Sequence, residues 1–207
     1  MSLESENNTE ILIKKILVLG VVLGLVVIGW GFVNESNTEK RIELSNKIRE
    51  IEVGPLASYK DGKIQANEVL KKFTSLTEDT SEASVGLAFA LQFNDALIEK
   101  NDFATSSKLM EHMKTKVEDS IARQIVLSRL ATAKEEDGKV KDAIEALNEL
   151  LTLKYSVLDD KAYFDLGRLH IKAGNNGKAK DSLNYVIEKS KDSELVKLSK
   201  YFLAKIK

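Results

Sequence analysis

A 36-residue repeat restricts the possible folds of this chain more than any other feature of its sequence. The segment LATAKEEDGKVKDAIEALNELL begins at Leu130, and LGRLHIKAGNNGKAKDSLNYVI begins at Leu166. The residue pairs that align at this spacing are Ala131 and Gly167, Gly138 and Gly174, Ala143 and Ala179, Leu147 and Leu183, and Leu150 and Val186. A period of this length is typical of arrays in which each repeat is one small structural unit stacked on the next.

The residue types at these positions predict two antiparallel helices in each repeat. A small residue in each helix lets the two backbones approach closely, and a glycine between them can adopt a positive φ and cap the first helix. The large apolar residues then fill the groove between neighbouring units. This order of small, glycine, small, large and large is that of a tetratricopeptide-like repeat, so we expect an all-α array.

Two weaker repeats precede this pair. In the nearer one, Asn101 occupies the glycine position, since asparagine also tolerates a positive φ, and Asn94 replaces the first small residue. This repeat continues with Phe103, Ser106, Met110 and Met113. The second half of a still earlier repeat is indicated by Gly62, Ala66, Leu70 and Phe73. After the last repeat, a closing helix is indicated by apolar residues on one face, which are Leu195, Leu198, Phe202 and Ile206. The array is therefore predicted over residues 56–207.

Composition agrees with a helical chain and excludes several functional classes. Pro55 is the single proline, and so few helix breakers favour long helices. Charge is balanced, with 31 Lys and Arg against 32 Asp and Glu, which is not the basic footprint of a duplex-binding protein. The absence of cysteine excludes disulfides, thiolate nucleophiles and cysteine-ligated zinc.

An uncharged apolar run of 18 residues, ILVLGVVLGLVVIGWGFV, covers residues 16–33. As a helix it would be about 27 Å long, close to the thickness of a bilayer's hydrocarbon core. No convincing signal-peptidase site with small residues follows it. We therefore expect a retained transmembrane helix after a tail of residues 1–15. Lys14 and Lys15 lie directly before the apolar run, and more basic residues lie further away after it, at 40–49. Because basic residues favour the cytoplasmic side, the charges on the two sides favour opposite orientations and leave the orientation of the helix open.

Within this run, Gly20, Gly24 and Gly31 share one helix face and could form a helix-docking surface, although membrane helices are also glycine-rich in general. Residues 34–55 are expected to form a juxtamembrane helix or linker with an apolar stripe at Leu44, Ile48 and Ile51. The pair Gly54-Pro55 is expected to end this helix.

No pattern of residues points to catalysis or to a cofactor or metal. His112 and His170 fall in different repeats without metal-ligand spacing, and His170 occupies a position where a packed histidine is expected. No glycine-rich phosphate loop follows a strand. We therefore expect neither an enzyme nor a cofactor site.

Binding of other proteins is the better-supported role. Lys161, Phe164, Arg168 and Ile171 lie in the first helix of the last full repeat, on the side expected to line a concave face. Two apolar side chains interleaved with two cations would suit an acidic and apolar peptide, unless neighbouring helices cover Phe164 and Ile171. Residues 161–207 carry 11 Lys and Arg against 5 Asp and Glu, which could attract an acidic partner or lipid headgroups or could be a solvated face.

Three segments of the chain are GVVLGLVVIGW, ASVGLAFALQFNDALIEKNDF and IVLSRLATAKEEDGKVKDAIEALNEL. They resemble the corresponding segments of the YfgM-like proteins, which are ancillary subunits of the bacterial Sec translocon. The resemblance covers residues 16–207 and implies a single-pass inner-membrane protein with a cytoplasmic N-terminus and a periplasmic repeat domain. It also implies three kinds of protein partner: Sec translocon subunits, a membrane-anchored periplasmic chaperone of the prolyl-isomerase type, and exported clients. The implied function is a non-catalytic adaptor or chaperone for exported proteins.

Two alternatives use the same array. A membrane-anchored scaffold for envelope assembly or cell division would bind different proteins, and a regulator facing the cytoplasm is compatible with the basic residues at 40–49.

Overall fold

The computed structural model describes residues 38–80, 82–155 and 157–206. The chain divides into two compact units, Met1–Ser45 and Asn46–Lys207, and the described part of the first is helical. The tail predicted over residues 1–15 and the transmembrane segment predicted over residues 16–33 lie outside the described residues. The glycines of the predicted docking face lie there too; they are Gly20, Gly24 and Gly31. In the part that the structure describes, no helix is both long enough and apolar enough to cross a membrane.

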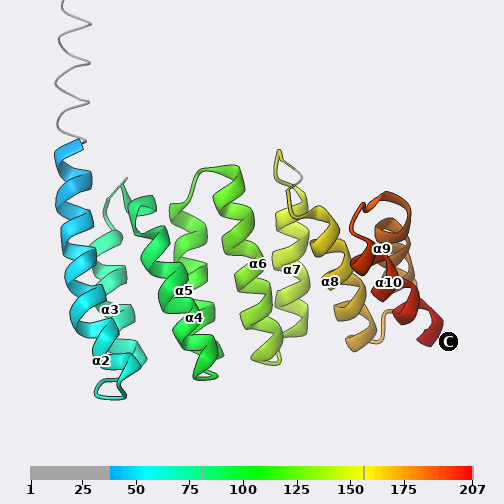
Figure 1. Ribbon diagram of the computed structural model, residues 1–207, viewed down its shortest axis with the longest axis horizontal. Coiled ribbons are helices and arrows are strands. Elements are labelled where there is room, and N and C mark those ends of the chain that lie inside the picture. Colours follow the sequence, from blue (N-terminus) through cyan, green and yellow to red (C-terminus); the bar gives the residue numbers. More distant parts are fainter. Residues whose placement is uncertain (1–37, 81, 156, 207) are drawn as a thin grey trace, which may run out of the picture. The chain divides into compact units, whose positions relative to one another are not determined.

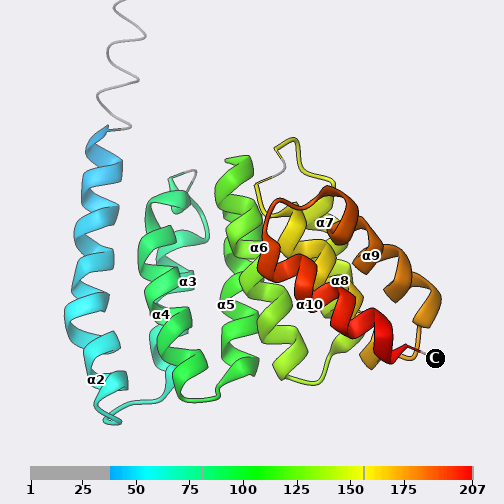
Figure 2. The same cartoon turned by 45° about the vertical axis from the view of Figure 1, so that its right-hand side comes forward.

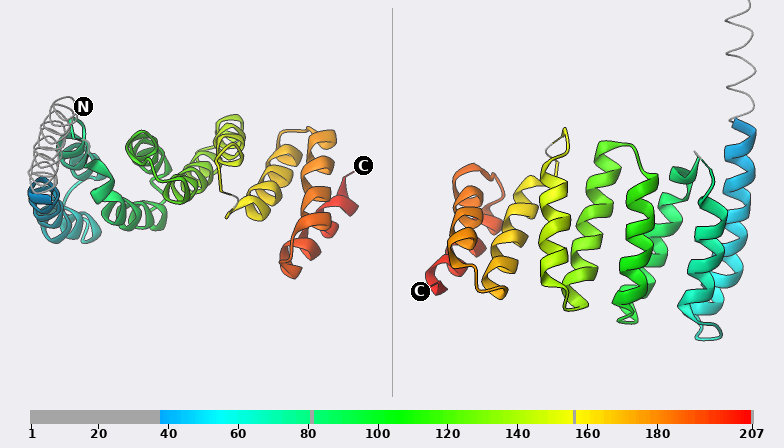
Figure 3. Two further views of the ribbon diagram at one scale, coloured as in Figure 1. Left: turned by 90° about the horizontal axis from the view of Figure 1, so that it is seen from above. Right: turned by 180° about the vertical axis from the view of Figure 1, so that it is seen from behind.

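The second unit is built from consecutive helical hairpins, with no strand among its described residues. After a helix over residues 38–51, the elements are η1 (Glu52–Leu56), α2 (Ala57–Lys60), α3 (Ala66–Thr77), η2 (Ala83–Gly86), α4 (Leu87–Glu99), α5 (Phe103–Lys116), α6 (Ser120–Glu136), α7 (Val140–Leu151), α8 (Asp159–Lys172), α9 (Asn176–Lys189) and α10 (Ser193–Lys205). From α4 onward each helix contacts the next, and Figures 1 and 3 show the hairpins standing side by side. The predicted all-α array is confirmed.

The turns inside the hairpins confirm the repeat read from the sequence. A positive φ occurs at Gly62, Asn101, Gly138 and Gly174, which are 39, 37 and 36 residues apart. After each of these residues, the next backbone N–H donates to the carbonyl five residues back, at 2.8–2.9 Å. This is the Schellman arrangement, in which a left-handed residue satisfies the last carbonyls of a helix. Asn101, with a φ of 59°, is the non-glycine member, as its position predicted.

The prediction that Gly54-Pro55 ends the first helix is wrong. The chain passes through a π-helical turn, Glu52–Leu56, with Pro55 inside it, and continues as α2 to Lys60. Proline lacks an N–H donor and its ring crowds the carbonyl four residues back, and a π turn is a known way to accommodate such a defect. The helix ends instead at Lys60, and Gly62 in the following turn has the positive φ. The compact second unit starts at Asn46.

The paired small residues bring the helices of a hairpin into close contact. In the last hairpin, a Cβ atom on Gly167 would lie 2.6 Å from Leu183 Cγ, so only glycine fits this arrangement of α8 against α9. In the hairpin before it, Ala131 and Ala143 are both buried. The large residues that follow are buried as well, with exposed fractions of 0–1%; they are Leu147, Leu150, Leu183 and Val186.

The α4–α5 hairpin replaces the small pair with a hydrogen-bonded polar pair. Asn94 takes the place of Ala131, and Ser106 takes the place of Ala143. Both side chains are buried, and Ser106 Oγ donates to Asn94 Oδ1 at 2.6 Å. Since buried polar groups are tolerated when they are hydrogen-bonded, this hairpin keeps the fold while departing from the repeat pattern.

A double-mutant cycle tests this pair. Ser106→Ala leaves the Asn94 amide oxygen buried without its donor and is expected to lower the free energy of unfolding by about 1.5 kcal/mol. Asn94→Ala/Ser106→Ala restores two small residues, so its loss is expected to be smaller than the sum of the two single losses. Urea denaturation of the four proteins measures the coupling. Strictly additive losses would show that the hydrogen bond contributes nothing.

The closing helix α10 packs on the last hairpin, as its apolar residues predicted. It contacts both α8 and α9, and Figure 2 shows it crossing in front of α8 with α9 beside it. Leu195, Phe202 and Ile206 contact the cluster formed by Phe164, Leu183 and Val186, whereas Leu198 remains 42% exposed. The α10 helix therefore closes the apolar surface that the last repeat would otherwise leave open.

Candidate protein-binding site

The first helices of successive hairpins, α4, α6 and α8, together form a face with a hollow of about 260 Å³, called here the α4–α6–α8 face. The residues that line the hollow are Asn94, Ile98, Ser128, Arg129, Thr132 and Lys161. Asn94 is held by Ser106 behind it, and the remaining side chains are only partly buried or exposed. The hollow therefore combines two cations, two hydroxyls, an amide and one aliphatic side chain.

Carboxylates position both cations of the hollow. Arg129 Nη1 pairs with Asp95 of α4, and Lys161 Nζ pairs with Asp165 one turn further along α8. These pairs are accessible to solvent, since Arg129 and Lys161 are 42% and 52% exposed. Exposed pairs of this kind are weak, so an acidic group on a partner could compete for either cation at low cost.

Arg168 plays a more structural role than the sequence suggested. Its Nη1 and Nη2 donate to the two carboxylate oxygens of Glu135 at 2.9 Å each, and Nη2 also donates to Asp165 Oδ1 at 3.0 Å. The hydrogen bonds from Arg168 hold the pKa of the Glu135 carboxyl below its usual value, and the same bonds raise the pKa of the guanidinium. Arg168 thus connects α8 to α6, in the way that Arg129 connects α6 to α4.

The structure covers the two apolar members of the predicted set. Phe164 is 9% exposed, and its ring lies 5.8 Å from that of Phe202 in an edge-to-face arrangement. Ile171 is partly buried and packs on the cluster of Phe164, Leu183 and Val186. Lys161 and Arg168 remain accessible on the α4–α6–α8 face, so the four residues do not form one open surface. Binding of a partner through them stays a prediction.

The sequence reasoning missed four residues of the hollow, although a signal was present for two of them; the four are Ile98, Ser128, Arg129 and Thr132. Shifting the candidate positions Phe164 and Arg168 back by the 36-residue period gives Ser128 and Thr132, which both line the hollow. Equivalent positions of stacked repeats line one face, so the candidate positions of α8 could have been extended to α6.

Both histidines pack against neighbouring parts of the array. His170 is 7% exposed, as expected from its position, and its Nδ1 has no hydrogen-bond partner within the described chain. His112 Nε2 lies 2.7 Å from Thr77 Oγ1. Burial lowers the pKa of both imidazoles. Across residues 38–80, 82–155 and 157–206, no group of three or more His, Asp or Glu side chains could hold a metal ion.

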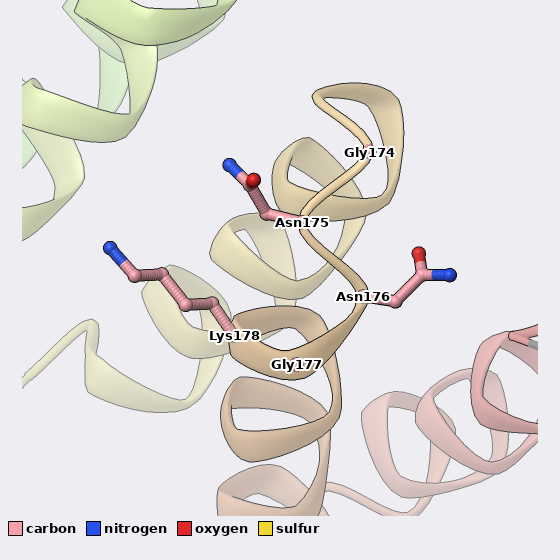
Figure 4. A pocket seen from close by; sticks show the side chains of 5 residues that line it. All are labelled: Gly174, Asn175, Asn176, Gly177 and Lys178. Carbon is pink, nitrogen blue, oxygen red and sulfur yellow. The ribbon is translucent and has the colours of Figure 1, made fainter.

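Two further hollows lie elsewhere on the second unit. One of about 250 Å³ between α5, α6 and α7 contains a network in which Lys114 bridges Glu111 and Glu149, at 3.1 and 3.4 Å. Another, of about 400 Å³, lies at the turn between α8 and α9. Figure 4 shows that its side chains spread outward, with Asn175 and Lys178 on one side and Asn176 on the other, so they do not converge on a ligand.

Comparison with known proteins decides the family. The sequence profile described as "Tetratricopeptide repeat-like domain" matches residues 12–163. The chain belongs to this family. Repeats of this kind form scaffolds for protein–protein interaction, and the fold is typically non-catalytic. A comparison with curated proteins gave no match.

Solved structures of the same fold include tetratricopeptide-like repeats of a putative kinesin light chain from Podosopora anserina. This structure is 20% identical to the chain, covers 79% of it and 86% of its own length, and superposes with a TM-score of 0.53. A single-substitution variant of the same repeats gives a TM-score of 0.54 at the same identity. A crystal structure of MamA is 12% identical and gives a TM-score of 0.47 over 72% of this chain and 90% of its own.

Proposed function

We propose that this tetratricopeptide repeat-like protein is a non-catalytic adaptor tethered to a bacterial inner membrane, and that its α4–α6–α8 face binds segments of other proteins. The observation that carries the proposal is the hollow on this face, where Arg129 and Lys161 project beside uncharged groups. An extended segment with acidic and apolar side chains suits such a surface, since carboxylates would pair with the two cations.

The tether is supported by the apolar run over residues 16–33, which the family match over residues 12–163 includes. With the N-terminus in the cytoplasm, the array would lie in the periplasm. In this position its partners would be Sec translocon subunits, a membrane-anchored periplasmic chaperone of the prolyl-isomerase type, and newly exported clients. The Sec partners are supported by the resemblance to YfgM-like proteins described above.

Photocrosslinking in living cells tests both the face and the partners. A photoreactive amino acid placed at Ser128 or Thr132 is expected to trap Sec subunits and exported proteins, because both positions line the hollow. The same amino acid at Glu145 on α7 is the matched control, because Glu145 lines a different hollow, between α5, α6 and α7. Crosslinks to envelope-assembly or division proteins, with no Sec subunit, would favour the alternative scaffold function instead.

A charge reversal tests the role of the two cations. Arg129→Glu/Lys161→Glu is expected to abolish the crosslinks at Ser128, whereas Lys72→Glu on the exposed side of α3 should leave them unchanged. Equal crosslinking in both variants would contradict binding through the cations.

Alkaline phosphatase fused after Lys207 tests the orientation of the array, since this enzyme is active only when it has been exported. An inactive fusion would indicate an array that faces the cytoplasm.

A further inference from the structure

Large apolar side chains of the second unit are exposed in two settings, inside helices and at one end of the unit. Val53, Leu198 and Tyr201 are exposed within η1 and α10. The turns inside the hairpins, at residues 61–65, 100–102, 137–139 and 173–175, define the turn end. The connections between hairpins, at residues 78–86, 117–119, 152–158 and 190–192, define the loop end. Figure 1 shows the α7–α8 connection, in yellow, projecting from the loop end.

Three large apolar side chains are exposed at the loop end: Ile121 at 45%, Tyr155 at 52% and Val157 at 58%. None of the described residues in the turns at the other end exposes one. Tyr155 and Val157 lie in the same connection, and Ile121 lies in the first turn of α6. Three exposed apolar side chains grouped at one end, with none in the turns at the other end, indicate a surface that meets a partner.

The connection that carries Tyr155 and Val157 is held by a buried amide. Gln124 of α6 is 0% exposed, and its Oε1 accepts hydrogen bonds from the backbone N–H of Val157 at 3.2 Å and of Leu158 at 3.1 Å. Its Nε2 donates to the carbonyl of Tyr155. The backbone at Tyr155, Val157 and Leu158 is therefore held on the α6 helix, while the Tyr155 and Val157 side chains remain exposed.

The chemistry of this loop suits the interface of a bilayer. Lys154 Nζ lies 5.6 Å from the centroid of the Tyr155 ring. Tyrosine and lysine both have an apolar body and a polar end, and both are common where hydrocarbon meets headgroups. The aliphatic side chains of Val157 and Ile121 would add apolar surface beside them.

The chain enters the second unit at this same end. Ile48 Cδ1 lies 3.4 Å from where a Cβ atom on Gly86 would be, and Gly86 belongs to the connection between α3 and α4. The apolar run ends at Val33, 13 residues before Asn46. A segment of this length spans about 20 Å as a helix and at most about 45 Å when extended. The loop end can therefore lie no further than this from the end of the apolar run at residues 16–33.

We propose that the loop end of the array contacts the lipid surface through Tyr155, Val157 and Ile121, beside the membrane that holds the anchor. This rests on the membrane tether of the proposed function. The acidic residues Glu78, Asp79, Glu118 and Asp119 also lie at this end, so the contact depends on insertion of apolar side chains into zwitterionic lipid rather than on anionic headgroups.

Because the chain has no cysteine, single spin labels can report the depth of chosen positions. The full chain is reconstituted in phosphatidylcholine nanodiscs with a label at Tyr155→Cys, Val157→Cys, Leu25→Cys or Lys139→Cys. Lys139 lies at the turn end and is the water-exposed control. The ratio of collision rates with oxygen and with a soluble nickel chelate is expected to be severalfold higher at residues 155 and 157 than at residue 139, and highest at residue 25.

A second variant shows that the native side chain, rather than the label, makes the contact. Tyr155→Glu combined with the label at residue 157 should lower the collision ratio to the value at residue 139. Water-like ratios at residues 155 and 157, with residue 25 in the bilayer, would overturn the lipid contact and leave the anchor intact. A water-like ratio at residue 25 would overturn the anchor, and with it the lipid contact.

Discussion

Gly167→Val is expected to lower the free energy of unfolding by about 3 kcal/mol, near the upper end of the usual cost of overpacking a core. A Cβ atom at this position would already lie 2.6 Å from both Cγ and Cδ2 of Leu183, and valine adds two more carbons. Leu183 is itself fully buried, so it has no free space into which it could move. The α8 and α9 helices would have to separate, and urea denaturation followed by circular dichroism would measure the loss.

Gly177→Val is the matched control on the same hairpin. Gly177 lies in the first turn of α9, and no atom outside its own local backbone would lie within 4 Å of a Cβ there. The expected change is within about 0.5 kcal/mol. If the two variants were equally stable, the close approach of α8 and α9 at Gly167 would not be a feature of the folded protein.

Arg168→Met is expected to lower the free energy of unfolding by about 2 kcal/mol at pH 7, between the values typical of exposed and of buried pairs. The variant leaves Glu135 and Asp165 without their main donor, although their side chains are only 12% and 15% exposed. Lys161→Met is the control, because Lys161 is 52% exposed and pairs with Asp165 alone. Its loss should stay within about 0.5 kcal/mol.

The difference between the wild-type protein and Arg168→Met should depend on pH. Hydrogen bonds from Arg168 hold the pKa of Glu135 below its usual value of 4.5. A carboxyl with a lowered pKa stabilises the fold fully above its unfolded-state pKa, and this stabilisation is lost as the pH falls through its folded-state pKa. The difference should therefore be greatest at neutral pH and shrink below about pH 4. A difference that stayed constant down to about pH 2 would show that Arg168 acts through packing alone.

Local rules account for the parts of the array that were predicted correctly. The turns at Gly138 and Gly174 depend on a backbone conformation that glycine adopts easily, so they can be recognised without knowledge of the rest of the fold. The same rule extended to asparagine located the turn at Asn101. The equivalent small and large positions followed from a period of 36 residues, because stacked repeats bury equivalent positions.

The same kind of local rule failed at Pro55. A Gly-Pro pair ordinarily ends a helix, but here a π turn carries the helix onward to Lys60. The residues that follow the proline are buried in the unit, with exposed fractions of 1% for Leu56 and 6% for Tyr59. Burial of these side chains favours continuing the helix, and it depends on neighbours that are distant in sequence, such as Phe93, whose ring lies 5.8 Å from that of Tyr59.

The sequence by itself determined the helical class, the repeat and its turns, since these depend on residues close together in the chain and on a regular spacing. Only the tertiary structure decided which side chains remain accessible. Phe164 packs against Phe202 of α10 and Ile171 is partly buried on the same cluster, whereas Arg129 joins Lys161 on the open α4–α6–α8 face. Accessibility depends on which helix covers which, and this is set by packing between segments that are distant in the sequence.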